Sequence, residues 1–186
     1  MNDLKPTLWK TCRILANENR LACLREVIAQ PGLDVGTLAH RLMVSEHHAS
    51  MMLRALQSRG LIRPIRQSRW VYYYPLPDPM VTSAAPVLSA IREKLLTPRA
   101  NLSAIIRILT AFTHPRRLAI LGRLQKCGAQ TEAEMSARLG ISRQAMTRHL
   151  LKLSKRGLIR QEDSCCRLQP ARDVLTRALI SEIERQ

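Results

Sequence analysis

The stretch SRQAMTRHLLKLSKRGLIR, residues 142–160, carries six basic side chains and no acidic one. Arginine can donate two hydrogen bonds to guanine, glutamine can bond adenine in the same way, and lysine or arginine can bind phosphate oxygens. These residue types on one segment suit contact with double-stranded DNA, although a basic face that meets only solvent is the alternative. Its first part would reach base edges and its last part phosphates. We expect DNA contacts from Ser142, Arg143, Gln144, Thr147, Arg148, Lys152, Lys155 and Arg156.

Residues 45–63, SEHHASMMLRALQSRGLIR, repeat this pattern with weaker chemistry. Glu46 stands where the other stretch has Arg143, and Met51 stands where it has Arg148. A basic loop follows between two short β-type runs, and such a loop suits a wing that lies on the DNA backbone or in the minor groove. The alternative is a copy specialised for packing or for a partner protein. The candidate DNA contacts here are Ser45, His47, Ser50, Arg54, Arg63, Arg66 and Arg69.

A helix must hold the basic side chains of the later stretch outward. Met146, His149, Leu150 and Leu153 recur with helical spacing, which predicts a buried face on a helix over 143–155. Ser142 is suited to cap its start, and a glycine follows its end. A preceding helix over 132–139, with a T-x-x-E capping box, and a tight Gly-Ile turn complete a helix-turn-helix. Met occupies the place of His149 in the earlier stretch, so we interpret this histidine as a core-edge residue.

The two stretches belong to one longer repeat. RLACL begins at Arg20 and RLAIL at Arg117, 97 positions later, and the same offset aligns 15–63 with 112–160 at 14 identities in 49 positions. We predict a mostly α-helical protein with small β-hairpin wings: one winged helix-turn-helix domain over 1–80, a helical linker over 81–100, and a second domain over 101–186. The expected elements are helices at 7–16, 20–30, 34–42, 46–58, 81–96, 101–111, 116–126, 132–139, 143–155 and 171–185, with hairpin strands at 61–65, 70–74, 158–162 and 165–169.

Composition favours an anionic partner. The 186 residues carry a formal net charge of +16, and 46% of them are hydrophobic but only 3% aromatic, which favours helical cores. Five cysteines without a CxxC indicate a reducing cytoplasm, where a DNA-binding protein would associate with the nucleoid. We expect no signal peptide and no membrane helix. No catalytic motif was found, so an enzyme is not expected, and neither is a cofactor.

The motifs RLACLREV, SEHHASMMLRALQSRGLIR and RWVYYYP resemble the winged helix-turn-helix of the ArsR type. HPRRLAILGRL and SRQAMTRHLLKLSKRGLIR resemble it more closely, and Thr147-Arg148-His149-Leu150 is similar to the S-R-H-L-type stretch of that family's recognition helix. The resemblance implies a prokaryotic transcription regulator, usually a repressor, which inserts the second helix of the motif in the major groove.

Two features depart from that family. Many metal-sensing members carry Cys-x-Cys just before the first helix of the motif, but residues 34–36 and 131–133 contain no cysteine. Cys165-Cys166 would chelate one ion poorly because the two are adjacent, so we expect no metal site. Family members are also normally one-domain homodimers joined by their first and last helices, whereas two copies are fused here.

The fusion allows an intramolecular pseudo-dimer, with a homodimer of the whole chain as the alternative. The helices near 7–16, 81–96, 101–111 and 171–185 would form the seam. The two recognition helices would then reach unlike half-sites roughly 34 Å apart, so the preferred DNA site should be asymmetric. The leading function is a sequence-specific DNA-binding regulator, with an effector that the sequence does not identify. The alternative is an architectural or adaptor protein that binds DNA without sequence preference or binds partner proteins.

Overall fold

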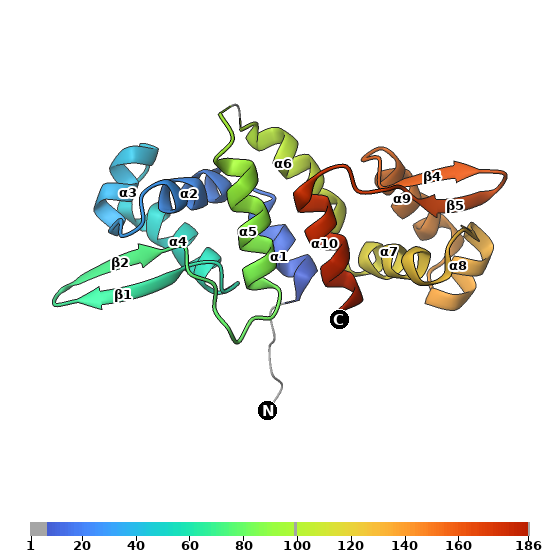
Figure 1. Cartoon of the computed structure of the whole chain (residues 1–186), viewed down its shortest axis with the longest axis horizontal. Coiled ribbons are helices and arrows are strands. Elements are labelled where there is room, and N and C mark those ends of the chain that lie inside the picture. The colour runs from blue at the N-terminus through green and yellow to red at the C-terminus, as the bar shows by residue number, and fades with distance from the viewer. Residues whose placement is uncertain (1–6, 99, 186) are drawn as a thin grey trace.

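The computed structural model of the protein describes residues 7–98 and 100–185 and is mostly helical with two small antiparallel sheets (Figure 1). Along residues 8–95 the elements are α1 (Leu8–Leu15), α2 (Glu18–Ala29), α3 (Val35–Leu42), α4 (Glu46–Gln57), β1 (Arg63–Gln67), β2 (Trp70–Tyr74) and α5 (Ala84–Leu95). Residues 102–184 form α6 (Leu102–Leu109), the 3-10 turn η1 (Thr110–Phe112), α7 (Pro115–Cys127), β3 (Gln130–Thr131), α8 (Glu132–Leu139), α9 (Arg143–Ser154), β4 (Ile159–Glu162), β5 (Cys165–Leu168) and α10 (Val174–Glu184).

Capping side chains set where several helices begin. The Thr131–Glu134 capping box starts α8 as the sequence predicts, and the Ser45 hydroxyl accepts a hydrogen bond from the His48 amide at the start of α4. Ser142 has the extended backbone of an N-cap, but its side chain accepts no hydrogen bond from the described residues. The prediction that the Ser142 hydroxyl caps α9 is therefore wrong, and this hydroxyl remains available for other hydrogen bonds.

Positions 97 apart share backbone geometry. Asn17, which caps α2, has φ −143° and ψ 130°, and His114, which caps α7, has φ −144° and ψ 130°. Gly60 and Gly157 both have positive φ, at 68° and 71°, after α4 and α9. A left-handed residue in this place ends a helix by turning the chain away from its axis.

An arginine at the start of α2 and its counterpart in α7 bond equivalent carbonyls. The Arg20 Nε atom donates to the Ile14 carbonyl oxygen at 2.5 Å, and the Arg117 Nε atom donates to the Ala111 carbonyl oxygen at 2.6 Å. Since Ile14 and Ala111 are also 97 positions apart, the same side chain ties the same turn in both halves. Arg117 is only 6% exposed and also donates to the Thr110 carbonyl at 2.8 Å.

The two hairpins lie at opposite ends of the long axis (Figure 1). Strands β1 and β2 pair antiparallel, with a two-residue connection at Ser68–Arg69 that is shorter than the expected four-residue loop. Strands β4 and β5 pair across Asp163 and Ser164, as expected, and both of these residues have positive φ, as a type I′ hairpin turn requires. The short strand β3, which the sequence analysis missed, pairs with β5.

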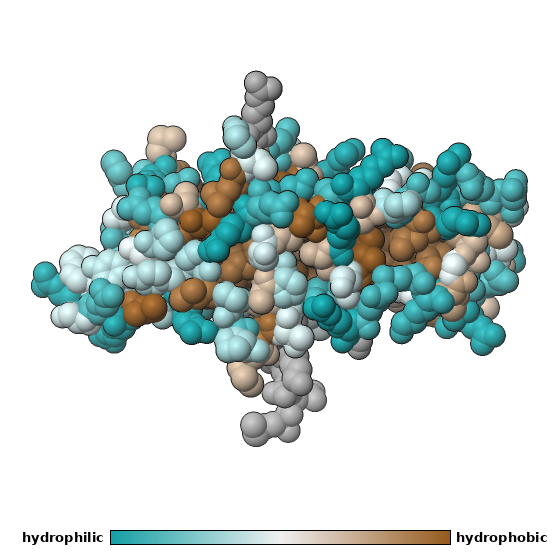
Figure 2. All heavy atoms as spheres, in the orientation of Figure 1, coloured by the Kyte–Doolittle hydropathy of each residue, from teal (hydrophilic) through white to brown (hydrophobic). Residues whose placement is uncertain are grey.

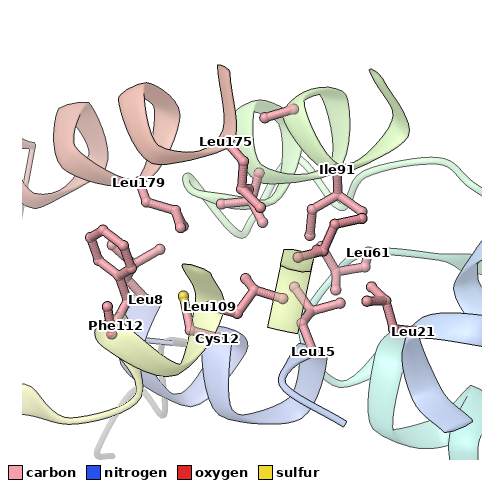
Figure 3. Close-up of a cluster of buried hydrophobic side chains, with 14 of the residues drawn as sticks. Leu8, Cys12, Leu15, Leu21, Leu61, Ile91, Leu109, Phe112, Leu175 and Leu179 are labelled. Atoms are coloured by element: carbon pink, nitrogen blue, oxygen red, sulfur yellow. The ribbon is translucent and has the colours of Figure 1, made fainter. Parts of the chain in front are cut away.

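Helices α1, α5, α6 and α10 meet in the middle of the molecule, where α1 packs on α6 and η1 and α5 packs on α10. Figure 3 shows Leu15, Ile91, Leu109 and Leu175, from four different helices, pointing into one cluster. Residues 81–100, expected as a helical linker, thus contain a packed helix, α5, with one face buried in this cluster. These four helices, from the segments expected at a seam, pack together within the chain.

The surface is mixed in character. Figure 2 shows teal, hydrophilic side chains spread over both ends of this face, with brown, apolar side chains showing between them and beside the β1–β2 hairpin. Within the described ranges, no helix combines the length and the apolar character needed to cross a lipid bilayer.

Candidate nucleic-acid interface

Helix α9 is held by one apolar face. Met146, Leu150 and Leu153 are buried as predicted, and the helix packs against α7, α8 and β4. This packing leaves the opposite face of α9 free of the protein core. The orientation is the one that a recognition helix needs in order to enter a DNA groove.

The outward face of α9 carries the cations. Arg143, Gln144, Arg148, Lys152 and Lys155 are all exposed. In the part of the chain that the structure describes, none of the four cationic residues in this group forms a salt bridge. The Arg148 Nε atom donates to the Gln144 carbonyl oxygen, at 3.2 Å, one turn earlier in the same helix. An open cationic ridge is therefore present on α9.

Thr147 has a partner that the sequence analysis did not foresee. Its hydroxyl donates to the Glu132 carboxylate at the start of α8, and it also lies 3.0 Å from the Arg143 carbonyl oxygen. The hydroxyl has a single proton, so a DNA base would have to compete with Glu132 for it. The capping box predicted an acidic first turn for α8, but only the angle between α8 and α9 brings Glu132 to Thr147.

Arg156, predicted to bind phosphate, is half-buried and already engaged. Its Nε atom donates to the Thr110 hydroxyl at 3.0 Å, and its Nη1 atom donates to the Lys152 carbonyl oxygen at 3.1 Å. These contacts join the end of α9 to η1. The guanidinium is turned toward the protein more than the sequence suggested, because the fold brings a segment 46 positions away beside it.

His149 is half-buried and lies beside His114, with the two ring centroids 4.7 Å apart. Burial lowers the pKa of His149 to about 4, assisted by the charges of His114 and of nearby basic side chains that include Arg117. Burial also lowers the pKa of His114, whose Nδ1 atom accepts a hydrogen bond from the Arg116 amide. Both rings therefore favour the neutral form.

Helix α4 repeats the arrangement with fewer charges. Ala49, Met52, Leu53 and Leu56 form its buried face. Among the predicted contact residues, Ser45, His47 and Arg54 are exposed, but Ser50 is half-buried. Met51, the counterpart of Arg148, is 53% exposed. The α4 surface is consequently less cationic and more apolar than that of α9.

The β1–β2 hairpin supplies the basic side chains that α4 lacks. Arg63, Arg66 and Arg69 are all exposed. Two of them bond backbone carbonyls: the Arg63 Nη2 atom lies 3.3 Å from the Pro77 oxygen and the Arg66 Nε atom 3.2 Å from the Ser68 oxygen. Arg69 lies over the ring of Trp70, 5.4 Å from its centroid. Trp70 pairs with Gln67 in the hairpin and is 51% exposed.

The β4–β5 hairpin is electrostatically different. The Arg160 Nε atom pairs with the Glu162 carboxylate at 2.8 Å, which offsets one of its positive charges. Among the predicted contact residues, the exposed cations of residues 102–184 therefore lie on or directly after α9. Those of residues 8–95 lie mainly on the β1–β2 hairpin, with Arg54 alone on α4.

The cysteine thiols are dispersed. Cys12, Cys23 and Cys166 are buried, Cys165 is half-buried and Cys127 is exposed. Burial raises the pKa of Cys23 to about 12, with a smaller contribution from a nearby glutamate. In residues 7–98 and 100–185, no group of three or more His, Cys, Asp or Glu side chains is placed to hold a metal ion.

Comparison with known proteins identifies the segment that contains α9. Residues 112–162, from the end of η1 to the end of β4, match the family model described as a helix-turn-helix domain. No curated protein matches the chain. The match includes the exposed cations of α9 and excludes α4 and the β1–β2 hairpin. Residues 112–162 therefore form a helix-turn-helix domain, of the kind that DNA-binding regulators carry.

Proposed function

We propose that this protein is a sequence-specific DNA-binding transcription regulator, acting as a repressor through tandem winged helix-turn-helix units over 1–80 and 101–186. The observation that carries the proposal is the exposed cationic ridge of α9, formed by Arg143, Arg148 and Lys152 on a helix anchored by its apolar face. Early side chains of α9 read base edges, and later ones bind phosphates. Counterion release supplies much of the affinity.

The tandem arrangement is supported by geometry at a constant offset of 97 residues. The hydrogen bonds of Arg20 and Arg117, the cap conformations of Asn17 and His114, and the left-handed glycines after α4 and α9 all recur at that offset. Local propensity alone would not place an arginine side chain on the equivalent carbonyl twice. A duplicated unit accounts for all three correspondences together.

The two units act as an intramolecular pseudo-dimer. Helix α1 packs on α6, which occupies the same place in the second unit, and α5 packs on α10 in the same way. Such contacts between like elements are those of an isologous, two-fold interface. Because α9 presents Arg148 where α4 presents Met51, the preferred DNA site is asymmetric, with its half-sites roughly 34 Å apart.

Selection of bound fragments from random double-stranded DNA tests the proposal. We expect an enriched asymmetric sequence, and Arg148→Ala should weaken its binding by about 1–3 kcal/mol and relax the preference at one position. Arg177→Ala, which removes an exposed arginine of α10, is the control and should bind as the unmodified protein does. If Arg148→Ala changes neither affinity nor preference, α9 does not read bases.

An architectural or adaptor role is the second candidate. The exposed apolar side chains Met51, Ile65 and Trp70 favour it, because they lie on α4 and the β1–β2 hairpin where the first unit would otherwise meet DNA. Equal affinity for selected and random DNA at matched salt would support this role and exclude sequence-specific regulation.

A further inference from the structure

A cleft of about 460 Å³ opens between α6, the junction of α9 with β4, and the connection from β5 to α10. The exposed cations on the outward face of α9 do not line this cleft. Four arginines line it: Arg107 from α6, Arg156 and Arg160 from the α9–β4 junction, and Arg172 from the connection before α10. Its volume is within the range of about 300–1,000 Å³ that small-molecule sites occupy.

The equivalent place in residues 8–95 is filled by the chain itself. Gly60 is buried there, and a Cβ atom on it would lie 2.9 Å from Val81 Cγ2 and 3.0 Å from Asp78 Cβ. Its counterpart Gly157 is exposed, and a Cβ atom on it would meet none of the described atoms within 4 Å. The difference follows from length, because residues 75–83 connect β2 to α5 but only residues 169–173 connect β5 to α10.

The cleft has more positive than negative charge. Asp173 is the only acidic residue among its described lining residues, and its carboxylate already caps α10 by accepting hydrogen bonds from the amides of Leu175 and Thr176, each at 3.1 Å. That carboxylate also lies 3.7 Å from the Lys94 Nζ atom. Among the described residues, Arg160 is the only one of the four arginines that has a carboxylate partner, Glu162.

We propose that this cleft binds a small organic carboxylate with a compact apolar body. Most of the uncharged lining is aliphatic, with Ile108 and Ala171 among its residues, and the arginines provide planar donors that match a carboxylate. The chain segment that fills the equivalent place combines an apolar and an acidic side chain, Val81 and Asp78. A free ligand with an apolar body and a carboxylate would fill the place that the shorter connection before α10 leaves open.

Arg156 connects this cleft to the recognition helix. It lines the cleft and donates to the Lys152 carbonyl oxygen at 3.1 Å, in the last turn of α9. A carboxylate that recruits the Arg156 guanidinium competes with this bond and with the bond to Thr110. The site therefore goes beyond the proposed DNA-binding function. A ligand bound there would change the hydrogen bonds at the end of α9.

Calorimetric titration of the full chain without DNA tests the site. The probes are benzoate, 4-phenylbutyrate and octanoate, each compared with its neutral amide at constant ionic strength and at up to about 10 mM, where a site with a Kd of ~1 mM is nearly saturated. We expect saturable binding of at least one carboxylate with one site per chain, and binding of its amide at least about tenfold weaker.

Matched variants locate the binding. Arg107→Gln and Arg172→Gln should each weaken it about tenfold or more, whereas Lys10→Gln, at the position equivalent to Arg107 in the filled half, should leave it unchanged. Ala171→Phe, which fills the cleft, should abolish binding while circular dichroism reports an intact fold. No saturable binding of any of the three carboxylates, or equal losses for Lys10→Gln and Arg107→Gln, overturns the proposal. DNA is absent from this titration, so its failure is separate from failure of the regulator function.

Discussion

The salt dependence of DNA affinity distinguishes binding by one unit from binding by both. Seven exposed cations have no carboxylate partner among the described residues. Four lie on or directly after α9 and three on the β1–β2 hairpin: Arg143, Arg148, Lys152, Lys155, Arg63, Arg66 and Arg69. If all of them neutralise phosphates, log K falls with log salt with a slope of about −6. Raising the salt from about 50 to 200 mM then weakens binding by roughly 6,000-fold.

Replacing the three hairpin arginines by glutamine isolates the contribution of the first unit. The slope should fall to about −3.6, and the same salt change should then weaken binding only about 150-fold. Fluorescence anisotropy with a labelled, selected duplex measures both slopes. The matched control replaces three exposed arginines of the central helices, Arg13, Arg92 and Arg177, by glutamine and should retain the original slope.

Either of two results would refute this reasoning. A slope near −3.6 for the unmodified protein would mean that the hairpin arginines do not meet phosphate. A steep slope that the hairpin variant leaves unchanged would mean that other cations do so. In both cases the first unit would not bind DNA through its wing.

Three further predictions concern the scaffold. Arg117→Met should lower the free energy of unfolding by about 3–5 kcal/mol, and Arg20→Met by about 1–2 kcal/mol. The difference is expected because Arg117 is the more buried and makes more short hydrogen bonds to carbonyls. Urea denaturation of the two variants compares the losses. The pKa of His149 is lowered to about 4 in the folded protein, so the free energy of unfolding should be highest above about pH 6.5 and should fall as the pH drops toward 4. His149→Met should remove about 1 kcal/mol of this loss, a value reduced for solvent screening. Thermal melts across this pH range measure the difference. Gly60→Ala should cost ~2 kcal/mol more than Gly157→Ala, because both have positive φ but only Gly60 lacks space; equal losses would contradict the filled-cleft geometry.

The local elements were predictable from sequence because their signals are local. The capping box and helical spacing placed α8 at 132–139, as observed, and predicted a helix over 143–155 where α9 covers Arg143–Ser154. The β4–β5 hairpin was expected across Asp163-Ser164, and the positive φ of both residues explains why a two-residue turn suffices there. In each case the determining residues lie within a few positions of one another.

The engagement of individual site residues was not predictable, because it depends on segments distant in sequence. Arg156 is held by Thr110, and Thr147 is held by Glu132, through contacts that only the packing of α9 against η1 and α8 creates. A helix over 81–96 was expected at a seam with three other helices, but the sequence did not indicate which of the three it contacts most; in the structure it is α10. Tryptophan is a residue type that usually packs in a core, yet Trp70 lies at the start of β2 and is 51% exposed to solvent.

Comparing positions 97 residues apart distinguishes residues that the fold requires in both places from residues that can differ. Arg20 and Arg117 make the same carbonyl bonds, since without them a turn in each half would lose its donor. The outward-facing positions of α4 and α9 are not needed for such a contact. At one of them α4 has the neutral Met51 and α9 has the positively charged Arg148. The connections after the two hairpins diverge in length, which closes a cleft in one half and opens it in the other. In the functions proposed above, a scaffold built twice assigns DNA reading and ligand binding mainly to one unit, while the other supplies a basic hairpin and half of the shared core.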